Sequence, residues 1–581
     1  FFPSLVSRLA GLEADDAISA VLNGNFSRGG DLGGHSVPLM PSWANLGNEQ
    51  VADILNYLGG LTKSGFERVT VEQVAAIRAS GSQTPEQQPI IRTELDRAAD
   101  LYNHRCAVCH GVDRQGAAGS ALQAFRMRDV GTQQIRSILH YGTPWGMPNW
   151  GTSDRLSPED MQLLARYLVL DVTPSAVLSP DSVLKGWRNV VDRKDRPTRR
   201  EFAQSADNLF VSLLHDTGHI ALIDAVNKIV LSVIDTGIAP HQIELSADDR
   251  LLYVLSRGGE LVMIDLFMAQ PQVVASVRIG YEARSFAVQD DYLVAGAYSP
   301  AQYSVLDART LKPLETRSLA PINGVEQSIG QVSALHQHSV LITTRAQGNL
   351  YRLDLQATDA SNQATLLGTY PLLQPGVPDL KNQKLMYPTD HGNVIVVNRK
   401  TGEVEKTFLV SDLSKASSGA TLQSPTSGVL WAVGSMYAKE IQMISVEAQE
   451  VIARLALPGG GSFSQAAHRS STRLWADMAL NSDPNFSGSV LTFDLNDLEA
   501  PPRQIPITSP IKEQSTTARV IYPQFNAAGD EIWLTVYDRQ DRGSSIVVLD
   551  EKTGEIKNVI DDARLITPIR TVGLANLQES Q

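Results

Sequence analysis

The chain has 581 residues, of which 43% are hydrophobic and 19% charged, so it is long enough for several domains with their own cores and too apolar to be disordered. Its formal net charge of −13 comes from 50 basic and 63 acidic side chains spread along the sequence, with no long basic run to follow a phosphate backbone, which argues against nucleic acid as a partner. No apolar stretch reaches the roughly 18 to 20 residues needed to span a bilayer, so no membrane span is expected.

The first two segments are predicted to be helical. Residues 1–75 contain helices and loops and end in an amphipathic run over 48–58. A linker rich in Gly, Ser, Gln and Pro lies within 76–95. Residues 96–175 form a second small helical domain, whose last helix is predicted to begin after Ser157, because Ser-Pro-Glu-Asp is a good N-cap sequence.

The only two cysteines, Cys106 and Cys109, lie directly before His110 in the sequence Cys-Ala-Val-Cys-His. In a C-x-x-C-H motif the two thiols add to the vinyl groups of haem and the imidazole becomes an axial iron ligand, so the motif predicts a covalently bound haem c. Because both cysteines are used here, neither a disulfide framework nor a multi-cysteine metal cluster is available. The alternative is a chance C-x-x-C beside a histidine.

A sixth iron ligand is expected from a distant loop. Residues 141–150 form a Gly- and Pro-rich turn that contains Met147, the predicted thioether ligand; a core methionine is the alternative. The first segment has a comparable loop around Met40, followed by a helix to Leu58. That arrangement resembles the second half of another class I c-type cytochrome domain, whose cysteine motif would precede residue 1.

From about residue 200 the pattern changes to short β-branched runs separated by turns. A unit made of an apolar strand, a polar turn and a second strand ending near Asp occurs first at 209–224 and 251–265, and about eight such units follow one another at a period of roughly 41 to 58 residues. This is the spacing of four-stranded propeller blades. The predicted fold is therefore multidomain, with α-helical cytochrome c domains followed by an all-β eight-bladed propeller over 200–575; a pair of β-sandwiches is the alternative.

Together these features resemble the cytochrome cd1 family, whose members join a c-type haem domain to an eight-bladed propeller with haem d1 at its axis. The resemblance extends from Leu101 to about Thr571, and its most specific parts include the cysteine motif, YGTPWGMPNWG at 141–151 and GHIALID at 218–224. It implies haem c and haem d1, or the dihydro precursor of d1, as cofactors of an electron-transfer oxidoreductase in denitrification.

The resemblance also assigns residues in the propeller. His241 corresponds to the proximal ligand of the d1 iron. Arg257 and Arg284 match arginines near the d1 carboxylates, a suitable role because a guanidinium can form paired hydrogen bonds to a carboxylate. Tyr298 and Tyr303 match aromatic residues of the same pocket. The alternatives are a structural histidine and surface arginines.

The distal side of the pocket departs from the family. Two histidines that supply protons to nitrite in the nitrite reductases align with Gln327 and Gln374, and glutamine can donate a hydrogen bond but not a proton. Two family arginines align with His215 and His391. Gln327, Gln374 and His391 are therefore the candidate catalytic residues. The histidines that could take the distal roles under a different alignment are His336, His338 and His391.

A d1 pocket without proton donors favours the dihydro-haem d1 dehydrogenase branch of the family, in which a propionate side chain of a bound d1 precursor is oxidised to an acrylate. A nitrite reductase that forms NO is the second hypothesis. A cytochrome whose propeller only binds or delivers a tetrapyrrole, without turnover, is the third. A quinoprotein dehydrogenase should show tryptophan-rich docking repeats and a calcium-binding Asn/Asp pair, which the sequence does not contain.

Haem is attached to two thiols outside the bacterial cytoplasm, so the resemblance implies an exported, periplasmic protein, although this chain contains no signal peptide. The expected partners are the tetrapyrrole and a small soluble redox protein of the cytochrome c or cupredoxin type, since the acidic balance suits a basic partner. A homodimer through the propellers is also possible by resemblance to the family.

Overall fold

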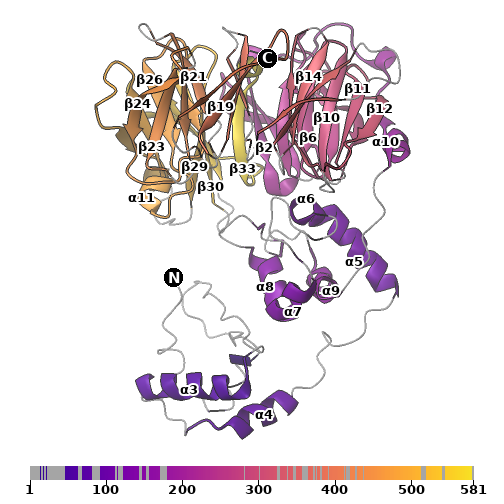
Figure 1. The fold of residues 1–581 in the computed structure, drawn as a ribbon, viewed down its shortest axis with the longest axis vertical. Helices are drawn as coiled ribbons and strands as arrows, with labels where there is room; N and C mark the ends of the chain where they lie inside the picture. The colour runs from indigo at the N-terminus through magenta and orange to yellow at the C-terminus, as the bar shows by residue number, and fades with distance from the viewer. Residues whose placement is uncertain are drawn as a thin grey trace. The chain divides into compact units, whose positions relative to one another are not determined.

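The computed structural model divides into two compact units, Phe1–Ser175 and Ala176–Gln581, the first helical and the second built mainly of strands (Figure 1). No helix among the described residues is both long and apolar enough to cross a membrane. The structure describes residues 46–62, 68–80, 92–111, 124–142, 156–170 and 179–578, apart from short loop gaps in the last range, together with isolated positions elsewhere.

The first helices of the chain are α3 (Asn48–Thr62) and α4 (Val71–Ser80). The amphipathic run predicted over 48–58 lies in α3, and its apolar side packs against Val74 of α4 in one buried cluster. The Asn56 side chain fixes the segment before α4, because its amide donates to the Val69 carbonyl at 2.9 Å and accepts from the Val69 N–H at 2.8 Å. α4 ends at Ser80, so it extends into the predicted linker.

The second group of helices surrounds the cysteine motif. Helix α9 packs against α5 and α8 over a core that includes Ala98, Tyr102 and Leu164. The Ser157 hydroxyl accepts from the Asp160 N–H at 3.0 Å, so α9 begins at the predicted N-cap. The helices are α5 (Arg92–Arg105), α6 (Ala107–His110), α7 (Ala124–Val130), α8 (Thr132–Tyr141) and α9 (Pro158–Leu168).

The second unit is an eight-bladed β-propeller, which confirms the predicted fold class (Figure 1). Each blade has four antiparallel strands, to which β1 (Arg188–Asn189) adds a fifth at the outer edge of the first blade, and we number the blades by the chain order of their innermost strands. Blade 1 contains β5 (Pro240–Leu245), β6 (Leu251–Ser256), β7 (Glu260–Asp265) and β8 (Gln272–Arg278), and blade 2 contains β9 (Glu282–Gln289), β10 (Tyr292–Ser299), β11 (Gln302–Asp307) and β12 (Pro313–Ser318). Blade 3 contains β13 (Ile329–Ala334), β14 (Ser339–Thr344), β15 (Asn349–Asp354) and β16 (Thr365–Thr369), and blade 4 contains β17 (Val377–Asp379), β18 (Lys384–Pro388), β19 (Asn393–Asn398) and β20 (Val404–Leu409).

The remaining blades complete the ring. Blade 5 contains β21 (Ala420–Ser424), β22 (Gly428–Gly434), β23 (Glu440–Ser445) and β24 (Glu450–Ala456). Blade 6 contains β25 (Gln465–Ala466), β26 (Arg473–Asp477), β27 (Ser489–Asp494) and β28 (Arg503–Pro506). Blade 7 contains β29 (Arg519–Phe525), β30 (Glu531–Tyr537), β31 (Ser545–Asp550) and β32 (Ile556–Ile560). The closing blade contains β33 (Pro568–Gly573), β2 (Leu209–Leu214), β3 (His219–Asp224) and β4 (Ile229–Asp235).

The closing blade joins the two ends of the propeller sequence. Its innermost strand β33 comes from the end of the chain and pairs antiparallel with β2. The Ser212 and Thr571 hydroxyls lie 2.9 Å apart across this pair and are buried. The propeller unit also includes residues before 200, because β1 (Arg188–Asn189) pairs with β8 and α10 (Pro180–Gly186) packs on β8 and β12.

Strand direction defines two ends of the propeller. Because the four strands of a blade alternate in direction, the start of each innermost strand and the turn between its second and third strands lie at one end. We call this the His241 end, since His241 is at the start of β5. The turns between first and second strands lie at the opposite end.

Several innermost strands lose their register near the His241 end. The pairing of β5 shifts between Pro240 and Gln242, so His241 lies in a bulge, and the pairing of β9 passes from Ala283 to Ser285 and leaves Arg284 in another. Strand β29 shifts between Ile521 and Gln524. A β-bulge turns a side chain away from the alternation of a regular strand and often occurs next to a functional site.

Candidate functional site

The cysteine motif folds as one turn at the end of α5. Cys106 continues the helical hydrogen bonding of α5, because its N–H donates to the Tyr102 carbonyl at 2.8 Å, and the His110 N–H donates back to the Cys106 carbonyl at 2.9 Å. Cys106 and His110 are buried, at 4% and 9% exposure, and Cys109 is half-buried. The structure therefore places the predicted haem c residues together on one turn.

The electrostatics of the motif argue against thiol–disulfide chemistry. Burial, and after it the nearby Cys109, raises the pKa of the Cys106 thiol to about 12. A redox-active C-x-x-C pair has a lowered thiol pKa, because the thiolate is the nucleophile. A buried sulfur in an apolar core suits a thioether bond to haem instead.

Met147 lies beside the same core as the cysteine motif. It is half-buried and packs against the cluster that contains Cys106, Tyr102 and Trp150. The structure thus brings the predicted sixth ligand and the predicted attachment site into one cluster, although Met147 and Cys106 are 41 residues apart in sequence (147 − 106). Met40, the corresponding residue suggested for the first segment, lies outside the described residues.

Sequence reasoning did not find Arg114, which fixes the segment after the motif. Its side chain is buried and donates to the backbone carbonyls of Leu170 at 2.9 Å and Tyr167 at 3.2 Å, at the C-terminal end of α9. The guanidinium carbon lies 4.2 Å from the ring centre of Tyr167 and 5.3 Å from that of Tyr102. A lone arginine in a loop carries no sequence signal for such a role.

In the propeller, the predicted residues gather around His241. Burial lowers the pKa of His241 well below its ordinary value, and the charges of Arg257, Arg284, Arg570 and then His215 lower it further. The imidazole is therefore neutral at physiological pH. Neutral imidazole is the form that binds a metal ion.

Backbone and side-chain bonds hold Arg257 and Arg284 in this cluster. The Arg257 N–H donates to the Ala239 carbonyl at 2.9 Å, and its carbonyl accepts from the Ala283 N–H at 3.0 Å, so Arg257 is tied to the strands before and after it. The Arg284 guanidinium donates twice to one oxygen of Glu282, at 2.8 and 3.2 Å. Its guanidinium carbon also lies 5.3 Å from the ring centre of Tyr298.

Two residues of this cluster were missed by the sequence analysis, Arg570 on β33 and Tyr522 on β29. Burial raises the pKa of the Tyr522 phenol, and the neighbouring charges that act on it include Arg570 and Arg257, so Tyr522 lies in the same cluster as His241. The bulges that place these side chains depend on the pairing of strands distant in sequence. No local sequence pattern therefore predicts that Arg570 and Tyr522 lie at this site.

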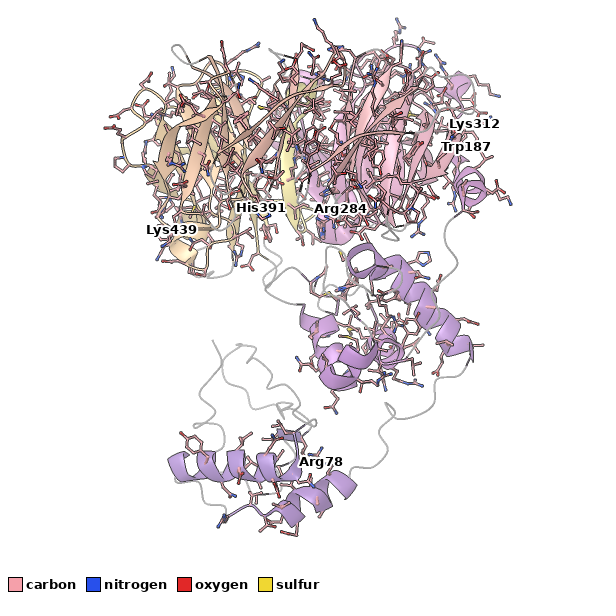
Figure 2. The ribbon with its side chains drawn as sticks, in the orientation of Figure 1. Arg78, Trp187, Arg284, Lys312, His391 and Lys439 are labelled. Carbon is pink, nitrogen blue, oxygen red and sulfur yellow. The ribbon has the colours of Figure 1, made fainter. Side chains whose placement is uncertain are left out.

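The other predicted pocket residues lie in different places. Tyr303 is 2% exposed and packs in the hydrophobic core between blades 2 and 3. Gln327 is fully buried before β13, where its amide oxygen accepts from Asn349 at 2.6 Å and Thr344 at 3.2 Å. His391 is exposed in the turn between β18 and β19, at the same end as Arg284 (Figure 2). Gln374 lies outside the described residues.

His336 and His338 cannot replace the distal histidines, which corrects one alternative of the sequence analysis. Both lie between β13 and β14, in a turn at the end opposite His241. There His336 bonds with Gln383, and the His338 imidazole lies 2.7 Å from the Asp290 carboxylate. Sequence proximity was misleading because the two ends of one strand face opposite sides of the propeller.

The cluster around His241 fits an anionic, metal-containing tetrapyrrole. It combines a neutral imidazole with three arginines, and the buried Arg570 Nε has no hydrogen-bond partner among the described residues. A buried guanidinium without a partner is costly unless an anion reaches it. The charge of the site therefore matches peripheral carboxylates, and His241 matches a metal at the centre of the ring.

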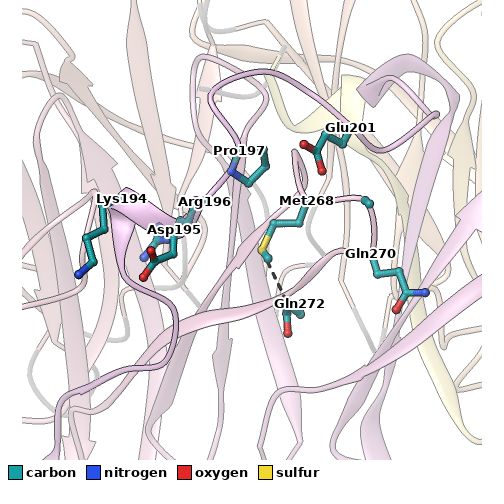
Figure 3. Close-up of a pocket in the computed structure, with 9 residues that line it drawn as sticks. Lys194, Asp195, Arg196, Pro197, Glu201, Met268, Gln270 and Gln272 are labelled. Atoms are coloured by element: carbon teal, nitrogen blue, oxygen red, sulfur yellow. Dashed lines mark hydrogen bonds between the residues drawn. The ribbon is translucent and has the colours of Figure 1, made fainter.

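A pocket of about 510 Å³ lies elsewhere on blade 1 (Figure 3). It is bordered by residues 194–201 and by the turn between β7 and β8, which is at the end opposite His241. None of the predicted site residues lines it. We therefore place the candidate site at the His241 cluster and not at this pocket.

Comparisons with known proteins agree with this architecture. The family model of the cytochrome D1 heme domain matches residues 204–571, and that of subunit III of cbb3-type cytochrome c oxidase matches residues 93–168. The nitrite reductase of Stutzerimonas stutzeri is 29% identical over 518 residues, which is 82% of this chain and 91% of the relative. The dihydro-heme d1 dehydrogenase of Pseudomonas aeruginosa is 26% identical over 257 residues, 44% of this chain and 52% of the relative.

A solved structure also shares the fold. The structure of dihydro-heme d1 dehydrogenase NirN in complex with DHE matches with a TM-score of 0.65 at 20% identity, and the match covers 83% of this chain and 99% of that chain. At this identity the likeness is one of fold. The helical unit and the propeller therefore occur together in a protein of known structure.

Proposed function

The chain belongs to the cytochrome d1 haem domain family, and from this premise we propose that it is a periplasmic electron-transfer oxidoreductase that acts as a dihydro-haem d1 dehydrogenase. Membership confirms the resemblance stated above and supports a function related to haem d1. The observation that carries the finer proposal is the neutral His241 among arginines; the resemblance adds Gln327, a residue without a proton to give, at the position of a distal histidine of the nitrite reductases.

The residues that would hold the two tetrapyrroles are separate sets. Cys106, Cys109, His110 and Met147 would hold haem c, which supplies a one-electron acceptor when bound. His241 would bind the metal of haem d1 or its dihydro precursor, with Arg257 and Arg284 near the ring carboxylates and Tyr298 against Arg284. The packing of Tyr303 in the core between blades gives no support to its assignment to the pocket.

The proposed reaction suits a site without a distal acid. Oxidation of a propionate side chain to an acrylate removes two hydrogens from adjacent carbons and releases two protons and two electrons, so the site must accept protons and need not supply them. The Gln327 amide oxygen accepts from Asn349 and Thr344, and an amide does not titrate, so Gln327 would neither supply nor take up a proton.

Nitrite reduction is the second candidate, favoured by the 29% identity over most of the chain. It requires a proton donor on the distal side, since reduction of nitrite to NO releases water. Of the histidines suggested for that role, only His391 lies at the correct end of the propeller, in a turn of blade 4. A nitrite reductase activity would therefore depend on His391.

The test compares two reactions on one preparation. The exported protein carrying haem c is incubated without oxygen with dihydro-haem d1 and an excess of an oxidised soluble c-type cytochrome, which takes up the two electrons one at a time through haem c, and the appearance of haem d1 is followed by its visible absorption. We expect this conversion in the native protein and its loss in His241→Ala. Nitrite turnover that disappears in His391→Ala would overturn the dehydrogenase proposal in favour of the reductase. Binding without either reaction would leave the tetrapyrrole carrier as the function.

We propose the remaining features on the same basis. The domains would be a partial cytochrome-like segment over 1–75, a linker over 76–95, a class I cytochrome c domain over 96–175 and a d1-type propeller over 200–575. The match to the cytochrome model over 93–168 supports the third of these. A periplasmic location, a small soluble redox partner and a homodimer are proposed from the family.

A further inference from the structure

Tyr522 and Arg570 form a pair at the His241 end that the proposed function has not used. They come from the innermost strands of two neighbouring blades, β29 of blade 7 and β33 of the closing blade. The Arg570 guanidinium carbon lies 5.6 Å from the centre of the Tyr522 ring. Blade 1, which carries His241, follows the closing blade around the ring, and the Arg570 charge acts on His241.

Both side chains keep free hydrogen-bonding groups. The Arg570 Nε is buried and has no hydrogen-bond partner among the described residues. Among the described residues no hydrogen bond is found for the Tyr522 hydroxyl, whereas its backbone N–H donates to Asp477. In contrast, Arg284 on the other side of His241 is already bonded to Glu282.

Tyr522 is held in place from the backbone. Its φ angle is +54°, a left-handed conformation that is rare for a large side chain and costs roughly 1 to 3 kcal/mol. The Asp477 carboxylate accepts the Tyr522 N–H at 3.0 Å and is itself fixed by the N–H groups of Phe463 and Ser464. The Phe463 ring packs edge-on against Tyr522 at 5.4 Å between centres.

These contacts fit a site for a carboxylate. A guanidinium and a phenol are both donors, and together they can bond the two oxygens of one carboxylate. The buried Arg570 Nε has no acceptor among the described residues, in a cluster that already carries excess positive charge, so it would otherwise lose its solvation without compensation. The strained, tightly bonded backbone at Tyr522 is the arrangement expected where a side chain must be presented to a ligand.

We propose that Arg570 and Tyr522 together bind one peripheral carboxylate of the tetrapyrrole, and that Asp477 is the residue that positions Tyr522 for this contact. The proposal rests on the proposed function, because it requires a tetrapyrrole at His241. It makes the last innermost strand of the propeller part of the ligand site. It also gives the two arginines different roles: Arg570 is available to the ligand, whereas the Arg284 guanidinium already forms an ion pair with Glu282.

The test measures affinity for tetrapyrroles by absorbance titration of the full-length protein. The probes are haem d1, iron coproporphyrin III with four carboxylates, and the tetramethyl ester of the latter. We expect Arg570→Met to weaken binding of both acids by about tenfold to hundredfold and Tyr522→Phe by about threefold to tenfold, because hydrogen bonds to charged groups are involved. Neither variant should weaken binding of the ester.

Controls separate this pair from general effects of charge or folding. Arg309→Met removes an exposed arginine at the opposite end of blade 2 and should leave all three affinities unchanged. Arg570→Lys retains the charge and should recover part of the loss. Asp477→Asn should weaken acid binding in the native background but add little in Tyr522→Phe, since it acts through Tyr522.

The possible failures are distinguishable. If the native protein binds neither haem d1 nor the other acid, the proposed function itself fails. If the native protein binds them and Arg570→Met and Tyr522→Phe bind equally well, only the carboxylate contact is wrong. Equal weakening of acid and ester in a variant that unfolds at the native temperature would mean that the pair shapes the site without contacting a carboxylate, which also overturns the proposal.

Discussion

The two units of this protein build their candidate cofactor sites in opposite ways. In the helical unit, Cys106, Cys109 and His110 lie on one helical turn, and packing adds Met147 from further along the chain. In the propeller, the site at His241 takes residues from consecutive blades, with Tyr522, Arg570, His241 and Arg284 on blade 7, the closing blade, blade 1 and blade 2. The first site needs little more than a local fold, whereas the second exists only when the ring is assembled.

This difference predicts how each site responds to substitutions. A substitution in the turn that carries Cys106, Cys109 and His110 should leave the strands of the propeller unaffected, because that turn supplies its own ligands. A site distributed over neighbouring blades is affected by any change that separates those blades, even one far from a ligand. Four predictions, from the largest expected effect to the smallest, test this contrast.

The largest effect is expected for the cysteine motif. Replacing both Cys106 and Cys109 by Ser should abolish covalent haem c, because no thiol remains to add to the vinyl groups. Haem c is measured by the pyridine haemochrome spectrum of the denatured protein. The affinity of the propeller for haem d1 should be unchanged, and a parallel loss of d1 binding would show that the two sites are not independent.

Removal of the central imidazole is expected to have the next largest effect. His241→Ala should weaken binding of haem d1 by about a hundredfold or more, since a metal–ligand bond and not a single hydrogen bond is lost. Covalent haem c should remain at the native level in the same preparation. His338→Ala, at the opposite end of the propeller, is the matched control and should bind haem d1 normally.

A smaller effect is expected from weakening the closure of the ring. Thr571→Val removes a buried hydroxyl that lies 2.9 Å from both the Ser212 and Thr535 hydroxyls and leaves them without that partner. We expect a loss of about 1 to 3 kcal/mol in the free energy of unfolding by urea. The affinity for haem d1 should fall as well, because Thr571 follows Arg570 on β33. Ser304→Ala, in the outer part of blade 2, should leave the affinity unchanged.

The smallest effect concerns pH. Burial raises the pKa of Glu244 on β5 to about 8, despite hydrogen bonds from the Val288 N–H and Gln242 that lower it. The folded state therefore holds a proton that the unfolded state has lost between about pH 4.5 and pH 8, so the free energy of unfolding should fall as pH rises through this window. Asp477, whose pKa burial raises to about 6, adds a contribution of the same sign at lower pH.

Urea unfolding at several pH values measures this dependence. Glu244→Gln should flatten the decline above pH 6, because glutamine does not titrate. Glu450→Gln, an exposed residue of β24, is the control and should leave the slope as it is. A steeper decline in Glu244→Gln would contradict the assignment.

The sequence predicted features whose signal is local or periodic. The cysteine motif is five consecutive residues, and the blades recur at a regular period, so the propeller and the helical unit could be identified without coordinates. His241 and Arg284 were found through resemblance to a family. The helix boundaries could not be read from the sequence, since α4 continues to Ser80 and α5 begins at Arg92, both inside the segment predicted as a linker.

What could not be predicted depends on pairing between distant strands. Arg570 and Tyr522 reach the site through irregular pairing in β33 and β29, and a bulge depends on the partner strand as much as on its own residues. The end of the propeller at which His336 and His338 lie follows from strand direction, which a repeat count alone does not assign to each residue. Glu282 and Arg284 form a buried ion pair, which no pattern in the sequence indicates.

The closing strand has a consequence for how the protein is made. Strand β33 follows every other strand of the propeller in the chain and carries Arg570, while its partner β2 precedes all seven complete blades. During synthesis, one edge of β2 therefore stays unpaired until the last part of the chain has been made. A tetrapyrrole that reached the chain before β33 was made would find a site without Arg570. We therefore expect the polypeptide to be completed before the tetrapyrrole binds.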